Sequence, residues 1–139
     1  TGGTIMGFYH YFSNRYDNFK AFPVFPVSNT DKGHRIEGIG DSFVPDILNL
    51  EALSPVVRVS DSDAINVARQ INKLGLSVGI SSGANVFSAI IKASQCQQGG
   101  TTATILCDDN KKYLSTDLCS DSEETLSREL KIKDFLRLS

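Results

Sequence analysis

Three short runs of small residues in this sequence could present backbone amides and hydroxyls to an anionic ligand. They are "TGGT" at residues 1–4, "GIGDS" at residues 38–42 and "GISSG" at residues 79–83. Glycines let the backbone approach a ligand closely, and a helix that begins at such a run adds the positive end of its dipole. If the three runs converge, they form one pocket for a phosphate-bearing ligand.

Two of these runs also have plainer interpretations. "TGGT" is neither the dinucleotide-binding fingerprint nor a phosphate loop that ends in a lysine, and a glycine turn that only starts a helix is at least as common. In the run at 79–83, Ser81 or Ser82 could cap the N-terminus of a helix instead of binding a ligand. Neither run is specific by itself.

The run at 79–83 has a third interpretation as the nucleophile of a hydrolase. Gly79, Ser81 and Gly83 match the G-x-S-x-G pattern of α/β-hydrolases. In that fold the histidine follows the serine, whereas His10 and His34 both precede it here. The order of the residues therefore counts against a serine hydrolase.

Composition limits the remaining function classes. The 139 residues carry 14 basic and 16 acidic side chains, a net charge of −2 without a basic run, which counts against a nucleic acid as partner. No apolar run approaches the roughly 18 residues of a membrane-spanning helix, and no signal-peptide pattern is present. Three cysteines without paired spacing favour a reducing compartment, so we expect a cytoplasmic protein without a metal site.

Hydrophobic periodicity predicts strands that alternate with helices. Strands are expected at residues 22–28, 55–60, 76–80 and 103–107. Helices are expected after the glycines of the first run, after residue 40, from Ser60 or Asp61 to Gly75, within 81–94 and over 121–138. The aromatic side chains of residues 8–12 are expected to pack in the core. This alternation indicates one α/β domain with a parallel sheet, whose carboxyl edge would collect the three runs.

Four stretches together resemble the carboxyl-terminal portion of the cysteine synthases, which belong with the cystathionine β-synthases to the fold-type-II pyridoxal-phosphate enzymes. They are "TGGT", "GHRIEGIGDSFVPDIL", "VVRVSDSDAINVARQINKLGLSVGISSGANV" and "KKYLST", and they follow the family's order and spacing over nearly the whole chain. The resemblance implies a three-layer αβα fold with a mostly parallel sheet, like that of tryptophan synthase β, over residues 1–139. It also implies pyridoxal 5'-phosphate as cofactor.

The resemblance assigns roles to individual residues. Those expected at the cofactor phosphate are Thr1, Gly2, Gly3 and Thr4. Those expected to border the bound amino acid are Gly38, Ile39 and Gly40. Ser81 would hydrogen-bond the pyridine nitrogen, where a neutral hydroxyl does not enforce ring protonation as a carboxylate would. The ring is then a weaker electron sink, which suits elimination from an O-activated serine.

The family's Schiff-base lysine lies in an amino-terminal segment ahead of the phosphate loop, as does the loop that binds the substrate carboxylate. Every lysine in this sequence follows the phosphate loop, so the catalytic lysine is unknown here. We therefore expect Thr1 to be a cut rather than a start. The isolated chain should be inactive without the missing amino-terminal portion of the same enzyme.

By resemblance, the whole enzyme would convert O-acetylserine and sulfide to cysteine and acetate, as a homodimer and with serine acetyltransferase as a candidate partner. Two departures keep other functions open. Residues 107–112, "CDDNKK", stand where the family has P-D-x-G-E-R, which puts contacts at the ring-nitrogen end in doubt. Glu37, where cysteine synthases often have glutamine, slightly favours the cystathionine β-synthases. That type, or another β-replacement or β-elimination enzyme, is one alternative. A non-catalytic module that binds a phosphate ligand or a partner is the alternative from another class.

Overall fold

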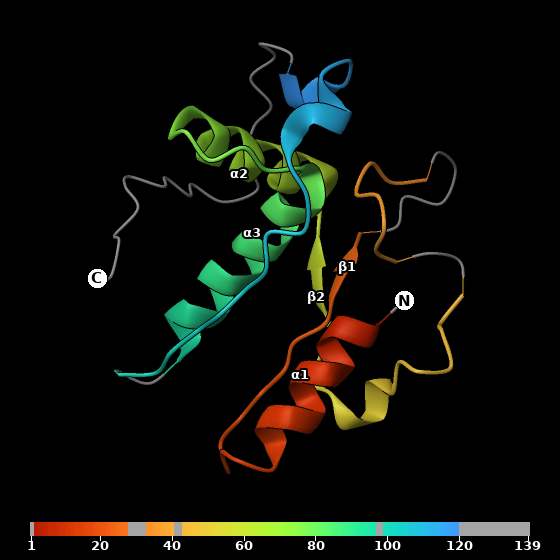
Figure 1. Ribbon diagram of the computed structural model, residues 1–139, viewed down its shortest axis with the longest axis vertical. Coiled ribbons are helices and arrows are strands. Elements are labelled where there is room, and N and C mark those ends of the chain that lie inside the picture. Colours follow the sequence, from red (N-terminus) through yellow and green to blue (C-terminus); the bar gives the residue numbers. More distant parts are fainter. Residues whose placement is uncertain (1, 28–32, 41–42, 97–98, 120–139) are drawn as a thin grey trace.

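The computed structural model of the protein describes residues 2–27, 33–40, 43–96 and 99–119 (Figure 1). Within these residues the chain forms α-helices, short 3-10 helices and a parallel pair of strands. In chain order the elements are α1 (Gly3–Ser13), β1 (Val24–Pro26), η1 (Leu50–Ala52), β2 (Val57–Val59), α2 (Asp61–Lys73), α3 (Ile80–Gln95), η2 (Asn110–Tyr113) and η3 (Asp117–Cys119). None of the helices in these ranges is long and apolar enough to cross a membrane.

β1 and β2 confirm two of the predicted strands and their parallel direction. In the register of the pair, Val24 lies opposite Val57 and Pro26 lies opposite Val59. Pro26 has no N–H to donate, which is tolerated at a strand end. The pairing continues past it, because the N–H of Val27 donates to the carbonyl of Val59 at 2.8 Å.

The core of the described structure lies where α2 and α3 cross each other and cover β2. The two helices pack tightly at Gly83 in α3, where an added Cβ would lie 2.0 Å from the carbonyl oxygen of Ala64 and 2.9 Å from the Cβ of Ala68. Ile65 and Ile71 of α2 are fully buried beside this contact in the same hydrophobic cluster. Small residues at the crossing therefore let two helix backbones approach closely enough to bury their larger neighbours.

Both ends of α2 follow the predicted signals. Ser60 is the N-cap, and its hydroxyl accepts the N–H of Asp63 at 3.1 Å. Two acidic residues, Asp61 and Asp63, lie in the first turn, where their negative charges interact favourably with the positive end of the helix dipole. After Lys73, Gly75 adopts the left-handed conformation, with φ of 93°, that ends the helix.

Two predicted strands are wrong in the described structure. Residues 76–79 and 103–107 form no ladder, although the N–H of Gly79 donates to the carbonyl of Asp108 at 3.0 Å. Short apolar runs carry a preference for extended backbone, but a strand also needs a neighbour for its hydrogen bonds. For these runs no described segment fills that place.

The helix expected after residue 40 is also absent from the residues described there. The chain makes a turn at 46–47 and then the short helix η1. Pro45 disfavours a helical conformation in the residue before it, and the side chain of Asn49 accepts the N–H groups of Glu51 and Ala52, so the helical turn starts only after residue 49. The helix predicted over 121–138 lies outside the described residues.

Helix α1 lies at the opposite end of the molecule from α2 (Figure 1). Its buried residue is Met6, whereas Phe8 and Tyr11 are 44% and 54% exposed. Phe8 stacks instead on Phe12, with their ring centroids 5.8 Å apart. The expectation that these aromatic side chains pack in the core is therefore wrong, because they pack on one another along the helix.

The α2–α3 contact predicts an unusual response to a glycine-to-alanine change. Alanine normally stabilises a helix relative to glycine, but Gly83→Ala places a methyl group against the Ala64 carbonyl and should lower the free energy of unfolding by about 1–3 kcal/mol. No described residue lies within 4 Å of a Cβ added at Gly7 in α1, so Gly7→Ala should raise the free energy of unfolding by about 0.5–1 kcal/mol. Urea unfolding measures both changes, and a Gly83→Ala chain as stable as wild type would contradict the proposed packing.

Candidate functional site

The described part of the second glycine run, residues 38–40, lies at the carboxyl edge of the two strands, as predicted. Gly40 has a positive φ of 72°, and an added Cβ would lie 2.3 Å from Cδ of Pro26, the last residue of β1. Just before the run, the N–H of Arg35 donates at 3.0 Å to the carboxylate of Asp61, the first residue of α2, which begins two residues after the end of β2. Residues 38–40 are thus held over the ends of both strands.

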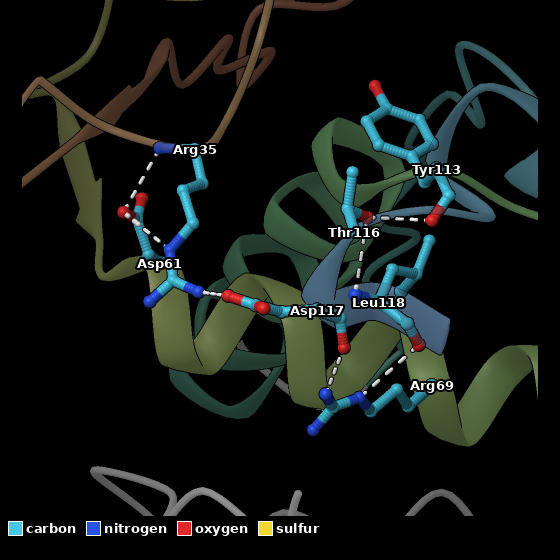
Figure 2. A network of polar contacts seen from close by, with 7 residues as sticks. All are labelled: Arg35, Asp61, Arg69, Tyr113, Thr116, Asp117 and Leu118. Carbon is cyan, nitrogen blue, oxygen red and sulfur yellow. Dashed lines mark hydrogen bonds and ion pairs between the residues drawn. The ribbon is translucent and has the colours of Figure 1, made fainter. Parts of the chain in front are cut away.

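A polar network fastens two loops to α2 (Figure 2). The guanidinium of Arg35 forms ion pairs with Asp61 and Asp117, and Arg69 donates to the backbone carbonyls of Asp117 and Leu118. The side chains of Arg35 and Asp117 are about half exposed, so their ion pair adds little to stability. Its consequence is positional, since it joins the loop before residue 38 to η3.

A pocket of about 290 Å³ lies inside this network. The residues that line it include His34, Arg35, Glu37, Ile80, Tyr113 and Asp117. Charges of both signs therefore surround apolar side chains. Among the described residues, the buried Nδ1 atom of His34 has no hydrogen-bond partner, so it is a polar atom available to a ligand.

The start of α1 has the conformation of an anion-binding helix N-terminus. Gly2 is its N-cap with φ of 82°, and an added Cβ would lie 2.8 Å from Cβ of Leu48. Gly2 has no side chain to cap the helix, and the first amides of a helix, here those of Gly3 and Thr4, have no acceptor within it. No side chain of the N-cap residue occupies these amides, so within the described part of the chain they suit an anion. Thr1 lies outside the described residues.

The third run starts α3, but neither serine caps it. The N-cap is Gly79. The hydroxyl of Ser82 accepts the N–H of Cys107 at 2.9 Å, and the hydroxyl of Ser81 donates to Oδ1 of Asp108 at 3.3 Å. The capping interpretation is therefore wrong, because both hydroxyls face the segment that runs alongside α3 (Figure 1).

The geometry around Ser81 differs from that of a hydrolase nucleophile. Gly79 is extended, with φ −85° and ψ 177°, and Ser81 lies in the first turn of a regular helix rather than on a strained turn. Ser81 is only 5% exposed, and its hydroxyl partner is a carboxylate rather than an imidazole. The site offers no support for a serine hydrolase.

Asp108 is a site residue that the sequence interpretation missed. Besides the Ser81 hydroxyl, it accepts the hydroxyl of Tyr113 on Oδ2 at 2.9 Å and pairs with Lys112 at 3.1 Å. Its position directly after the apolar run 103–107 was the available signal, since ligand contacts gather at the carboxyl ends of strands. Each of the three glycine runs has a different neighbour among the described residues: Leu48 at Gly2, Pro26 at Gly40 and Asp108 at Gly79. The convergence of the runs in one pocket therefore stays a prediction.

Asp108 also affects the ionisation of its neighbour. Burial raises the pKa of the Tyr113 hydroxyl above its ordinary value of 10.0, and the hydrogen bond to Asp108 raises it further. Tyr113 therefore remains neutral and can donate to the carboxylate throughout the physiological range.

Parallel strands, a glycine-started helix and a polar pocket at the carboxyl edge define an α/β protein of the kind that binds anionic cofactors. A family model described as pyridoxal-phosphate dependent enzyme matches residues 1–108. The chain belongs to this family, which confirms the predicted fold class and cofactor class.

Several individual enzymes of this family are similar to the chain. Cysteine synthase B of Campylobacter jejuni is 43% identical over 124 residues, which are 85% of this chain and 41% of that protein. Among solved structures, the hydrogen sulfide-producing enzyme of Fusobacterium nucleatum is 42% identical with a TM-score of 0.79, over 89% of this chain and 39% of that one. The O-acetylserine-dependent cystathionine β-synthase of Helicobacter pylori is 32% identical with a TM-score of 0.74, over 84% and 40%. The chain thus spans between 39% and 41% of the length of these relatives.

The raised pKa of Tyr113 predicts a loss of stability in alkali. Above pH 10.0 a tyrosine in the unfolded chain ionises while Tyr113 in the folded chain does not. The contribution of Tyr113 to the free energy of unfolding should therefore be complete below pH 10.0. It should decrease as the pH rises from 10.0 toward the pKa of Tyr113 in the folded chain. Tyr113→Phe should show a smaller fall in urea unfolding, and Tyr16→Phe, at an exposed position, is the control. Equal pH dependence in wild type and Tyr113→Phe would contradict this assignment.

Proposed function

We propose that the whole protein carrying this chain is a pyridoxal-phosphate-dependent β-replacement enzyme that converts O-acetylserine and sulfide to cysteine and acetate. The observation that carries the proposal is the family match over residues 1–108, together with 43% identity to a cysteine synthase. We propose with it that the whole protein acts in the cytoplasm as a homodimer, with serine acetyltransferase as a candidate partner.

The described residues fit the cofactor at two points. The uncapped amides after Gly2 suit a phosphate dianion, so residues 1–4 would hold the phosphate. Ser81 is nearly buried and its oxygen keeps lone pairs, so it would hydrogen-bond the pyridine nitrogen. When bound, the cofactor supplies the electron sink for loss of the substituent on the β-carbon of the substrate.

The loop over the strand ends would position the amino acid. Gly38, Ile39 and Gly40 would border it, and the positive φ of 82° at Gly38 and 72° at Gly40 gives this backbone a conformation that other residues rarely adopt. The loop is anchored by Arg35, whose N–H and guanidinium both contact Asp61. A fixed loop presents its backbone groups to the substrate without first losing conformational entropy.

We further propose that residues 101–107 pack against another portion of the whole protein, which would carry the Schiff-base lysine. All seven residues are exposed, including the apolar Ile105 and Leu106 at 38% and 45%. The segment is held to α3 by Asn85, whose side-chain amide donates to the carbonyl of Ile105 at 3.0 Å. An exposed apolar run with extended preference is suited to pair with a further strand.

Two alternatives remain beside the cysteine synthase reaction. The similar solved structures include a hydrogen sulfide-producing enzyme at 42% identity and a cystathionine β-synthase at 32%, so similarity alone does not select the sulfur nucleophile. A non-catalytic module that binds a phosphate ligand or a partner is the second alternative.

The test of function uses the protein expressed from its complete reading frame. With pyridoxal phosphate and O-acetylserine, we expect cysteine from sulfide at a higher kcat/KM than cystathionine from homocysteine. The chain of residues 1–139 alone should give neither product, because the lysine is expected elsewhere. Cysteine formation by the isolated chain would contradict the missing-lysine proposal, and a preference for homocysteine would favour the cystathionine β-synthase alternative.

A substitution at Gly2 tests the phosphate site. Gly2→Ala forces a left-handed conformation on alanine and brings its Cβ to 2.8 Å from that of Leu48, so the start of α1 must shift. A strain of about 1–2 kcal/mol at this position should weaken binding of pyridoxal phosphate by about tenfold. Gly7→Ala, five residues further along the chain, should leave the Kd unchanged. Equal Kd values for Gly2→Ala and wild type would exclude residues 2–4 from the phosphate site.

A further inference from the structure

Two buried polar atoms beside the start of α2 have no hydrogen-bond partner among the described residues. They are Nδ1 of His34 and Oδ1 of Asp61. Buried polar atoms normally find a partner, because leaving one without a hydrogen bond costs free energy. Neither atom contributes to the contacts proposed for the cofactor or the substrate. The pair therefore calls for an explanation outside the proposed chemistry.

The carboxylate of Asp61 lies against the backbone of His34. The N–H of Arg35 donates to Oδ2 of Asp61 at 3.0 Å (Figure 2). The nitrogen of this N–H is bonded directly to the carbonyl carbon of His34. The side chain of Arg35 approaches the same oxygen, with Nε at 3.7 Å. Oδ1 is therefore the oxygen of Asp61 that remains for the imidazole.

The protonation state of the imidazole decides whether the two atoms can bond. A carboxylate oxygen only accepts hydrogen bonds, whereas Nδ1 of a neutral imidazole accepts or donates according to its tautomer. Protonation places a hydrogen on both ring nitrogens, so Nδ1 becomes a donor. A bond from an imidazolium to a carboxylate is also charge-assisted, and about twice as strong as a neutral one. A proton on His34 thus supplies what the two buried atoms lack.

The described charges around His34 are predominantly negative. The titratable and charged residues that line the pocket with it or hold its segment are Arg35, Glu37, Asp61, Tyr113 and Asp117. Tyr113 is neutral, because burial raises its pKa. The guanidinium of Arg35 is paired with Asp61 and Asp117. A positive charge on His34 therefore meets an excess of negative charge from the described parts of α2, η3 and its own segment.

We propose that His34 is a proton-operated latch that closes onto Asp61. When the imidazole is protonated, a rotation of its side chain brings Nδ1–H to Oδ1 of Asp61. Residues 33–40 are then fastened to α2 by a second bond, beside that of the Arg35 N–H. The structure has the open arrangement, with both atoms unpaired within the described ranges. Because histidine changes its charge between about pH 5 and 8, the latch is closed at the acid end of this range and is lost as the pH rises through it.

The latch acts on the loop that borders the proposed substrate. Gly38 and Gly40 belong to the same segment as His34, and Gly40 packs against Pro26 at the end of β1. A second bond at the other end of the segment limits its movement over the strand ends. Acid conditions should therefore stiffen this loop, whichever reaction the whole protein catalyses.

Nitrogen-15 NMR of the histidines in the complete protein tests the bond. The signals of His34 are assigned by their loss in His34→Gln, and those of His10, at an exposed position of α1, by their loss in His10→Gln. Asp61→Asn keeps an acceptor for the N–H of Arg35 but removes the charge. It should lower the pH midpoint of the His34 titration by at least about one unit, because the protonated form loses its charge-assisted bond, and leave that of His10 unchanged.

Hydrogen exchange of the backbone amides of residues 35–40 tests the effect on the loop. After correction for intrinsic exchange rates, these amides in wild type should be at least about fivefold better protected at about pH 5 than at about pH 8. His34→Gln and Asp61→Asn should abolish this difference. His10→Gln removes the other histidine of the sequence and should behave as wild type does.

Each outcome decides the proposal. One His34 midpoint for wild type and Asp61→Asn overturns the latch, because the carboxylate then has no effect on the proton. Protection of residues 35–40 that does not change with pH in wild type also overturns it. If Asp61→Asn fails to fold, the comparison of wild type with His34→Gln decides. Both effects together, retained in His10→Gln, establish the latch, and neither measurement depends on whether the complete protein makes cysteine.

Discussion

The close contact between α2 and α3 at Gly83 is the constraint on which the rest of the described structure depends. Because Gly83 has no side chain, the carbonyl of Ala64 and the methyl of Ala68 reach the backbone of α3. The contact sets the first turn of α3 beside the first turn of α2. These turns carry Ser81 and Asp61, the groups that hold the surrounding loops. One packing contact therefore decides where the polar parts of the site lie.

The loops are fastened to these helix starts by side chains rather than by a continuous sheet. Arg35 joins Asp61 to Asp117, which brings the loop before residue 38 and η3 to the same face of α2. On α3, Ser81 and the residue after it hold the segment at 107–108. Half-exposed ion pairs of this kind add little to the free energy of folding. Their effect is geometric, because they build a pocket from segments that are distant in the sequence.

Elements with local signals were predictable and those that depend on distant partners were not. Helix α2 has its cap at Ser60 and its stop at Gly75 within its own stretch of sequence, and both were predicted. The runs at 76–80 and 103–107 have the composition of strands, but a ladder requires a neighbour that local composition does not reveal. The glycine run at 38–40 was placed correctly at the sheet edge, whereas the alternative that Ser81 or Ser82 caps α3 was wrong, because the N-cap is Gly79.

The sequence by itself determined the order of the small-residue runs, the resemblance to pyridoxal-phosphate enzymes and the candidate residues of the site. Such information is local, since each motif is a few adjacent residues whose types suit one task. Only the tertiary structure decided that the Ser81 hydroxyl donates to Asp108, a partner 27 residues away. That meeting requires the packing of α3 and the absence of a side chain at Gly79, which lets the carboxylate lie over the backbone. From the sequence Ser81 was a neutral hydroxyl, and in the folded chain it is a hydroxyl whose hydrogen is already engaged.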